Sequence, residues 1–229
     1  MFILHDKVFL HMPKTGGGSM LKILRQNKLI RKKVGDHKAI SCMPKEFEHL
    51  PKFIMTRNPF NWYVSLYFFH KQLMVKDSKI AEWLNPFYGT LNKDDGFDSF
   101  VRNACNMKEF YSDPNLMSKL DESFHTAVKN VPLSAVKSWQ DSGSLVRCDA
   151  LMDWYADTVG INSPNVSVYK LEDLSEDMPK IFRHSYKLPH RNKSAHSSIR
   201  DYYNPKSIAI VKKAHEEMMD KHEYTYPTK

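Results

Sequence analysis

The chain has 229 residues, a length typical of one domain with a substantial hydrophobic core. Its 34 lysines and arginines against 26 acidic residues give a formal net charge of +8, which favours an anionic partner without choosing among nucleotides, anionic substrates, nucleic acids and membrane surfaces. The three cysteines, Cys42, Cys105 and Cys148, are odd in number and widely spaced, which argues against a disulfide framework and a cysteine-based metal site.

The strongest local signal is the stretch KVFLHMPKTGGGS, residues 7–19. Residues 8–12 predict a short buried strand, which Pro13 ends because proline has no N–H for the ladder. Three glycines follow, and Ser19, a favourable N-cap residue, precedes a helix predicted over residues 20–27. A strand, a glycine loop and a helix N-terminus in this order bring free N–H groups and the positive end of a helix dipole together. This geometry holds phosphate groups.

The loop departs from the Walker A motif, in which the lysine follows the glycines. Here Lys14 precedes them, and Ser19 comes directly after them. The order Pro-Lys-Thr-Gly-Gly-x-Ser resembles the 5′-phosphosulfate loop of sulfotransferases that use PAPS (3′-phosphoadenosine 5′-phosphosulfate). That family usually has threonine where this chain has Gly18, a change that removes one hydroxyl donor and keeps the backbone donors. Taken alone, the loop is also compatible with an ordinary tight turn.

Residues 21–33 mix basic and apolar side chains and are interpreted as an amphipathic helix with a basic solvent face, or as a basic wall facing an anionic acceptor. Gly35 and Asp36 mark a turn, and residues 39–42 predict a short strand. Several carbohydrate sulfotransferases carry a Lys-His or Gly-His element between the phosphosulfate loop and the next core strand, and His37 stands in the matching place. His37 is therefore the candidate general base, although a lone loop histidine is more often a surface residue.

A second buried strand is predicted over residues 52–57, and Asn58-Pro59 stops it before an aromatic-rich helix over residues 60–69, whose rings are expected in the core. Arg57 would leave the strand end as a bidentate phosphate donor, and Ser65, two turns into the helix, would add a hydroxyl. This segment resembles the family's 3′-phosphate element. Arg57 alone would equally suit a salt bridge, so the pair of phosphate elements in the right order carries the interpretation.

The middle of the chain, residues 71–143, adds nothing to the resemblance. Turn signals break it, and it is expected to form a variable helical excursion on the acceptor side, with a helix at 97–106 and another at 121–130. Candidate acceptor contacts there and beside it are His70, Lys71 and His125.

After a possible strand at 145–148, a helix at 149–159 ending at Gly160, a strand at 165–169 and a helix capped by Ser175 are expected. Glu172 and Asp173 between the last two are assigned structural hydrogen bonding.

A polar, basic segment occupies residues 188–203. In sulfotransferases a late loop of this kind closes over the nucleotide, often with an Asn-x-Ser element before a Tyr-Tyr pair. The resemblance makes Arg191, Lys193 and Ser194 candidate contacts to the 3′-phosphate or the adenine, and a plain loop is the alternative. Residues 205–221 predict a closing helix.

Together the elements predict an α/β fold in a single domain over residues 1–229, with a parallel β-sheet flanked by helices. The resemblance implies that this is the P-loop-like nucleotide-binding fold of the sulfotransferases. The resemblance implies transfer of a sulfuryl group from PAPS to a hydroxyl or amine of a small-molecule or carbohydrate acceptor, without a metal. Backbone donors of Thr15, Gly16, Gly17, Gly18 and Ser19 would hold the 5′-phosphate. Lys14 would stabilise charge on the bridging oxygen, and His37 would accept the acceptor's proton.

The N-terminal residues do not match a signal peptide, and no apolar run approaches the roughly 18 residues that span a membrane. The chain therefore resembles soluble bacterial or viral relatives of the carbohydrate sulfotransferases, and the expectation is a cytoplasmic protein with no nucleic-acid partner. One alternative is a P-loop nucleotide kinase or NTPase, which predicts a lysine after the glycines and a magnesium-binding aspartate at a strand end. Another is a basic nucleic-acid-binding protein, which predicts a recognisable binding motif or a stripe of exposed aromatic residues.

Overall fold

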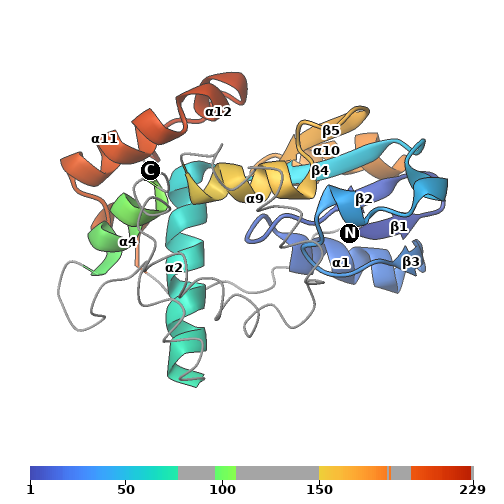
Figure 1. The fold of residues 1–229 in the computed structure, drawn as a ribbon, viewed down its shortest axis with the longest axis horizontal. Coiled ribbons are helices and arrows are strands. Elements are labelled where there is room, and N and C mark those ends of the chain that lie inside the picture. Colours follow the sequence, from blue (N-terminus) through green and yellow to red (C-terminus); the bar gives the residue numbers. More distant parts are fainter. Residues whose placement is uncertain (77–95, 107–149, 185, 187–196, 228–229) are drawn as a thin grey trace. The chain divides into compact units, whose positions relative to one another are not determined.

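The computed structural model describes residues 1–76, 96–106, 150–184, 186 and 197–227 of the chain. Figure 1 labels the helices and strands along the chain. The chain divides into two compact units. Unit 1 comprises residues 1–58 and 155–193, and unit 2 comprises residues 59–154 and 194–229. The sequence-based expectation of a single catalytic domain stays a prediction.

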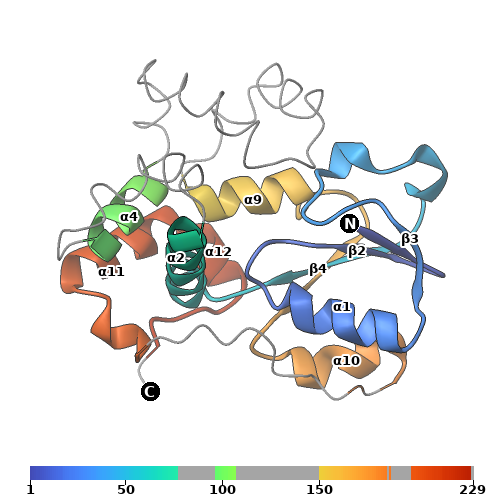
Figure 2. The ribbon, with the colours of Figure 1, turned by 90° about the horizontal axis from the view of Figure 1, so that it is seen from below.

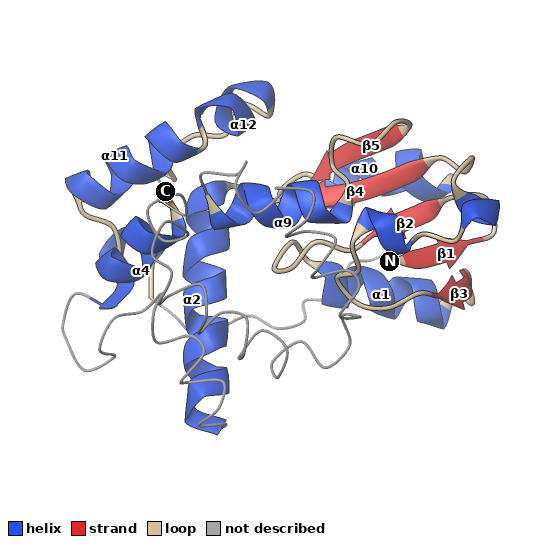
Figure 3. Cartoon of the chain, in the orientation of Figure 1, coloured by secondary structure: helices blue, strands red, loops and turns tan. Residues whose placement is uncertain are grey.

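Unit 1 is built on a five-stranded mixed sheet with the order β3-β1-β2-β4-β5 (Figure 3). Its strands are β1 (Phe2–Leu4), β2 (Val8–Leu10), β3 (Ile30–Lys33), β4 (Lys52–Thr56) and β5 (Val166–Lys170). The strands β2, β4 and β5 are parallel, whereas β1 is antiparallel to both β2 and β3. The α/β class is confirmed, and the purely parallel sheet is wrong. A three-residue turn joins β1 to β2, and a connection this short permits only antiparallel pairing.

The strand directions gather several loops at one edge of the sheet. Because β1 runs against both of its neighbours, β3 points the same way as β2, β4 and β5. After β2 the chain moves through α1 (Gly17–Gln26) to β3 on one side, whereas after β4 it continues on the other side to β5. The strands β2 and β4 therefore flank a topological switch point, the position at which open α/β sheets bind ligands.

The helices α1 and α10 (Leu174–Phe182) lie on the same side of the sheet (Figure 2). Their apolar faces share one core with strand side chains such as Phe9, Phe53 and Met55, all of which are at most 3% exposed. Each large side chain buried in this way contributes about 1.5–3 kcal/mol to folding. The core thus fixes the start of α1 against the end of β2, which sets the geometry of the glycine loop.

The boundaries of α1 differ from the prediction at both ends. Gly16, with φ of 82°, occupies the N-cap position in place of Ser19. At the other end Asn27 closes the helix: its side-chain amide donates to the carbonyl of Ile23 at 2.9 Å. Lys28 then adopts a left-handed conformation with φ of 54°. A right-handed helix cannot continue through this conformation.

Two further local predictions in unit 1 are wrong. Residues 30–33 form β3 and pair with β1, so they are not the second half of an amphipathic helix. The short strand predicted at residues 39–42 is a 3₁₀ turn, η1 (Ile40–Cys42), followed by η2 (Lys45–Phe47). Tertiary pairing and packing override the weak local propensity of such short segments.

Unit 2 is helical within its described residues. Its elements are α2 (Pro59–Lys76), α4 (Gly96–Ala104), η3 (Ile199–Asp201), α11 (Pro205–Ala214) and α12 (Glu216–Lys221), while α9 (Leu151–Val159) carries the chain back into unit 1. The aromatic side chains of α2 form core, as predicted: Phe60, Trp62 and Tyr63 are 0% exposed, although Phe69 is 40% exposed. No helix among the described residues is long and apolar enough to cross a membrane.

The predicted closing helix is broken in two at His215, whose backbone leaves the helical region with φ of −122°. Asn204 and Ser207 form a capping box at the start of α11, with Pro205 in its first turn. The helix predicted at residues 121–130 and the strand predicted at 145–148 lie outside the described residues.

Candidate functional site

The glycine loop follows β2 at the edge where the four parallel-running strands end. A Cβ atom on Gly16 would lie 2.4 Å from Cδ1 of Leu171, just after β5, and Gly16 also needs its positive φ. A Cβ atom on Gly17 would lie 1.8 Å from Nε2 of His11. Close packing therefore requires both glycines before any ligand is considered.

The loop retains a small set of backbone donors. The N–H groups of Ser19 and Met20 both donate to the carbonyl of Gly16, at 3.0 and 3.1 Å. The Thr15 hydroxyl is fully buried and donates to the carbonyl of Met12 at 3.0 Å, so it holds the turn. Within the described part of the chain, the N–H groups of Gly16, Gly17 and Gly18 make no backbone hydrogen bond. These three groups lie at the positive end of α1.

The structure brings together two of the predicted site residues, Lys14 and Arg57. Arg57 follows β4, and its Nη1 donates to the carbonyl of Lys14 at 3.3 Å. Burial, and then the positive charge of Arg57, lowers the pKa of Lys14 to about 8. Two cations thus share the edge next to the free N–H groups, which favours an anion there.

Acidic residues after β5 hold the neighbouring loop in place. The backbone N–H of Asn58 donates to Oε1 of Glu172 at 3.0 Å, and the N–H of Leu171 donates to the carbonyl of Thr56 at 2.9 Å. The structural hydrogen bonding predicted for Glu172 is confirmed.

Asp173 forms an ion pair with Lys170 at 3.0 Å. Asp173 rather than Ser175 occupies the N-cap position of α10, and its side chain makes no capping hydrogen bond.

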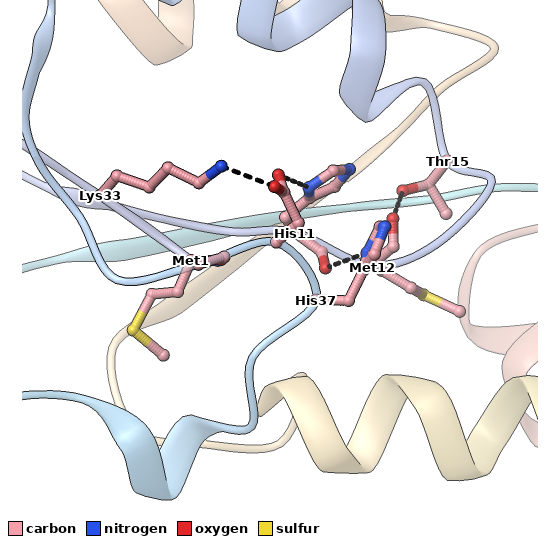
Figure 4. A network of polar contacts seen from close by, with 8 residues as sticks. Met1, His11, Met12, Thr15, Lys33 and His37 are labelled. Carbon is pink, nitrogen blue, oxygen red and sulfur yellow. Dashed lines mark hydrogen bonds and ion pairs between the residues drawn. The ribbon is translucent and has the colours of Figure 1, made fainter. Parts of the chain in front are cut away.

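The ring of His37 lies against that of His11 at an interplanar angle of 42°, and the two form what we call the imidazole pair (Figure 4). Their ring centroids are 4.1 Å apart, and Nδ1 of His37 lies 3.1 Å from the carbonyl oxygen of His11. A carbonyl oxygen only accepts, so Nδ1 of His37 must carry the hydrogen. Nε2 of His37 then holds the lone pair in the neutral ring, the form that a general base needs.

Charged groups next to the imidazole pair come from the last residue of β3 and from the turn after it. Lys33 Nζ lies 2.7 Å from Oδ2 of Asp36, and the other carboxylate oxygen lies 3.6 Å from Nδ1 of His11, longer than a hydrogen bond (Figure 4). The His11 imidazole and the Lys33 ammonium lower the pKa of Asp36. This carboxylate is therefore ionised at neutral pH.

The imidazole pair itself is kept neutral. Burial lowers the pKa of His11, against the opposing effect of Asp36. Burial and the neighbouring His11 also lower the pKa of His37. Because part of this residue is exposed to water, the effect of burial on its pKa is reduced. Both rings are uncharged at pH 7.

The remaining predicted residues are separate from this cluster or lie outside the described residues. Ser65 and His70 are 5% and 8% exposed on α2, within unit 2, so a contact of Ser65 with the same phosphate as Arg57 stays a prediction. The Lys71 ammonium lies 5.3 Å from the centre of the Tyr67 ring. Outside the described residues are His125, Arg191, Lys193 and Ser194.

His11 and Asp36 were not predicted to belong to the site. His11 is 7% exposed and stacked on Phe9. Because side chains two residues apart on a strand point to the same face, the position of His11 two residues after Phe9 places both rings on the α1 side of the sheet. This spacing was the sequence signal that could have indicated the placement of His11. The closeness of Asp36 depends on β3 pairing next to β1, and no local pattern contains that information.

Comparison with protein-family models, with curated protein sequences and with solved structures found no match. Among the residues that the structure describes, no group of three or more His, Cys, Asp or Glu side chains is arranged to hold a metal ion. The geometry of this edge and the sequence motifs are therefore the features from which a function can be inferred.

Proposed function

We propose that the protein is a PAPS-dependent sulfotransferase with a P-loop-like fold, acting on a hydroxyl or amine of a small-molecule or carbohydrate acceptor. The observation that carries the proposal is the meeting of the glycine loop with Arg57, joined by the hydrogen bond to Lys14, at the switch point between β2 and β4. Sequence alone had indicated each as a separate phosphate element.

The nucleotide would lie across these two loops. The free N–H groups of Gly16, Gly17 and Gly18 would hold the 5′-phosphate, and Arg57 the 3′-phosphate. Ser19 and Thr15 have their backbone or side-chain donors partly engaged within the loop. Contacts from Ser65, Arg191, Lys193 and Ser194 to the 3′-phosphate or adenine belong to the same proposal.

In the proposed reaction the acceptor oxygen or nitrogen attacks the sulfur of PAPS. A new bond to sulfur forms as the bond between sulfur and the bridging 5′-phosphate oxygen breaks. Its electron pair stays on adenosine 3′,5′-bisphosphate, where the Lys14 ammonium offsets the growing charge. The acceptor's proton passes to Nε2 of His37, the nitrogen left open by the hydrogen bond to the His11 carbonyl.

The lowered pKa of Lys14 agrees with this role. At a value of about 8 the side chain is mostly protonated at pH 7, yet it sits in a cationic, partly buried site that destabilises its charge until an anion arrives. An ammonium in such a site contributes most where negative charge develops during the reaction.

Thermal unfolding with three ligands separates this proposal from its rivals. Adenosine 3′,5′-bisphosphate should raise the melting temperature more than ATP with magnesium or duplex DNA, because a ligand at one hundred times its dissociation constant stabilises the native state by about 2.7 kcal/mol. The Arg57→Ala variant should lose most of that increase. A larger increase with ATP or with DNA would favour the kinase or the nucleic-acid-binding protein instead.

A further inference from the structure

His11 is aimed at the first turn of α1. Its Nε2 and Cδ2 would be 1.8 and 2.2 Å from a Cβ atom on Gly17, so this edge of the ring contacts the helix start. The residue is 7% exposed. Nδ1 is buried and makes no hydrogen bond within the described residues, with the Asp36 carboxylate 3.6 Å away. No described residue forms a hydrogen bond with Nε2. A buried ring nitrogen without a hydrogen bond, on a side chain packed against a helix N-terminus, requires an explanation.

A protonated His11 would have two donors with suitable targets. Nδ1–H would face Asp36, and Nε2–H would face the helix start, where three free N–H groups already favour an anion. The Lys33 ammonium opposes protonation of His11. The nearby α-amino group of Met1 has its pKa lowered to about 5 by burial, so it is mostly uncharged at pH 7, and the neighbouring His37 ring is neutral. Without an anion, burial therefore leaves His11 neutral.

We propose that His11 is a proton-linked ligand of a tetrahedral oxyanion, sulfate or phosphate, held at the N-terminus of α1. When the anion binds, His11 takes one proton from solvent, donates Nε2–H to the anion and donates Nδ1–H to Asp36. No covalent bond changes. The inference rests on the proposed function only in identifying that anion with the phosphosulfate end of the nucleotide.

Linkage then makes anion affinity depend on pH. Because the complex binds one more proton than the free protein, affinity rises as the pH falls, by up to about tenfold per pH unit while His11 is protonated in the complex and neutral in the free protein. Sulfate is the appropriate probe, since it does not titrate near neutral pH, whereas the second pKa of a phosphate group, about 6, would obscure the effect.

The test is an NMR titration of the imidazole signals, with sulfate compared against chloride at equal ionic strength. The His11 signal, identified by its loss in His11→Gln, should titrate at a pH at least about one unit higher in sulfate. His5, an exposed histidine between β1 and β2, provides an internal control and should not move. Asp36→Asn, at a residue whose side chain is 45% exposed and whose loss should leave the fold intact, should reduce the increase.

Each outcome has one meaning. An unchanged His11 titration in both sulfate and adenosine 3′,5′-bisphosphate would overturn the inference. So would a sulfate-induced rise in the titration pH of His11 that is as large in Asp36→Asn as in the native protein. An increase in sulfate that saturating adenosine 3′,5′-bisphosphate fails to reproduce would support the proton-linked ligand and contradict the proposal that the 5′ end of the nucleotide lies at the start of α1. The two claims therefore fail separately.

Discussion

Each of the two units contains a histidine cluster with a buried imidazole, and the two clusters differ in whether the ring nitrogens are hydrogen-bonded. In unit 2, His215 is 1% exposed, its Nε2 lies 2.8 Å from the Tyr63 hydroxyl, and its Nδ1 lies 3.0 Å from Oδ1 of Asp153. In unit 1, His11 is almost as buried, but neither ring nitrogen has a hydrogen bond within the described residues. The first ring has both nitrogens occupied, and the second has both available.

This difference in hydrogen bonding distinguishes a histidine with a structural role from histidines that are candidates for binding or catalysis. The chain Asp153–His215–Tyr63 joins α9 and α2 to the break between α11 and α12, and burial raises the pKa of Tyr63 far above its usual value, so the phenol stays protonated. Fully paired buried groups of this kind specify a packing arrangement. The imidazole pair, by contrast, keeps open nitrogens beside a cationic loop, as expected of groups that bind or react.

The largest effect should come from the imidazole pair. His37→Ala should lower turnover by about two to four orders of magnitude, the range for loss of a general base, while adenosine 3′,5′-bisphosphate binds normally. Because its pKa is lowered, the acid limb of the pH–rate profile should lie below pH 6.5 in the native enzyme and vanish in the variant. Single-turnover kinetics would measure this, with exposed His184→Ala as the control. Near-normal turnover with the same acid limb would assign the base to another residue.

The Arg57 site tests whether the cationic edge binds the nucleotide. Arg57→Ala should weaken adenosine 3′,5′-bisphosphate binding by about 2–4 kcal/mol, because a charged partner is lost from a partly desolvated pair. Calorimetry measures the change, and Arg25→Ala, at an exposed arginine near the end of α1, is the matched control. An unchanged dissociation constant would make Arg57 a scaffold residue that only holds the Lys14 carbonyl.

The His215 cluster should instead respond in stability. His215→Ala should lower the free energy of unfolding by about 2–4 kcal/mol, since it leaves a cavity and an unpaired Tyr63 hydroxyl. Urea unfolding of this variant, of Tyr63→Phe and of the double variant should reveal a coupling of at least about 0.5 kcal/mol. Additive effects would show that the two side chains do not act as a unit, and the contrast between the clusters would lose its basis.

The smallest effect expected is a gradual decline in turnover on the alkaline limb of the pH–rate profile. Lys14 must be protonated to offset charge on the departing nucleotide, and its pKa is about 8 in the empty site, so turnover should decline above that pH. Bound nucleotide adds negative charge and moves this limb upward. Lys14→Ala should lower turnover more than nucleotide affinity and should lack the limb. A native-like rate at saturating PAPS would contradict the role of Lys14.

The sequence predicted the elements whose signals are local. The apolar runs of β2, β4 and β5 and the Asn58-Pro59 stop before α2 were all recognised. Lys14 and Arg57 were predicted as separate phosphate contacts, and the hydrogen bond between them is a finding of the structure, in which the carboxyl ends of the parallel strands β2 and β4 meet at one edge. Residues 28–33 were misassigned because their mixture of basic and apolar side chains suits a helix as well as a strand.

The missed parts depend on contacts distant in sequence. The strand β1 is three residues long and is defined by its pairing with β2 and β3. His11 and His37 are 26 positions apart and meet only because β3 is placed beside β1. The break at His215 likewise reflects partners on α2 and α9 rather than any helix-ending residue.

The central claim is that the edge at β2 and β4 binds both ends of a nucleotide with phosphates at its 3′ and 5′ positions. Calorimetric comparison of adenosine 3′,5′-bisphosphate with ADP on the native protein tests it most directly. The two ligands carry phosphates on the same nucleoside and differ in whether one is at the 3′ position, so tighter binding of the bisphosphate, lost in Arg57→Ala, is the predicted result. Equal affinities for the two ligands would contradict the claim.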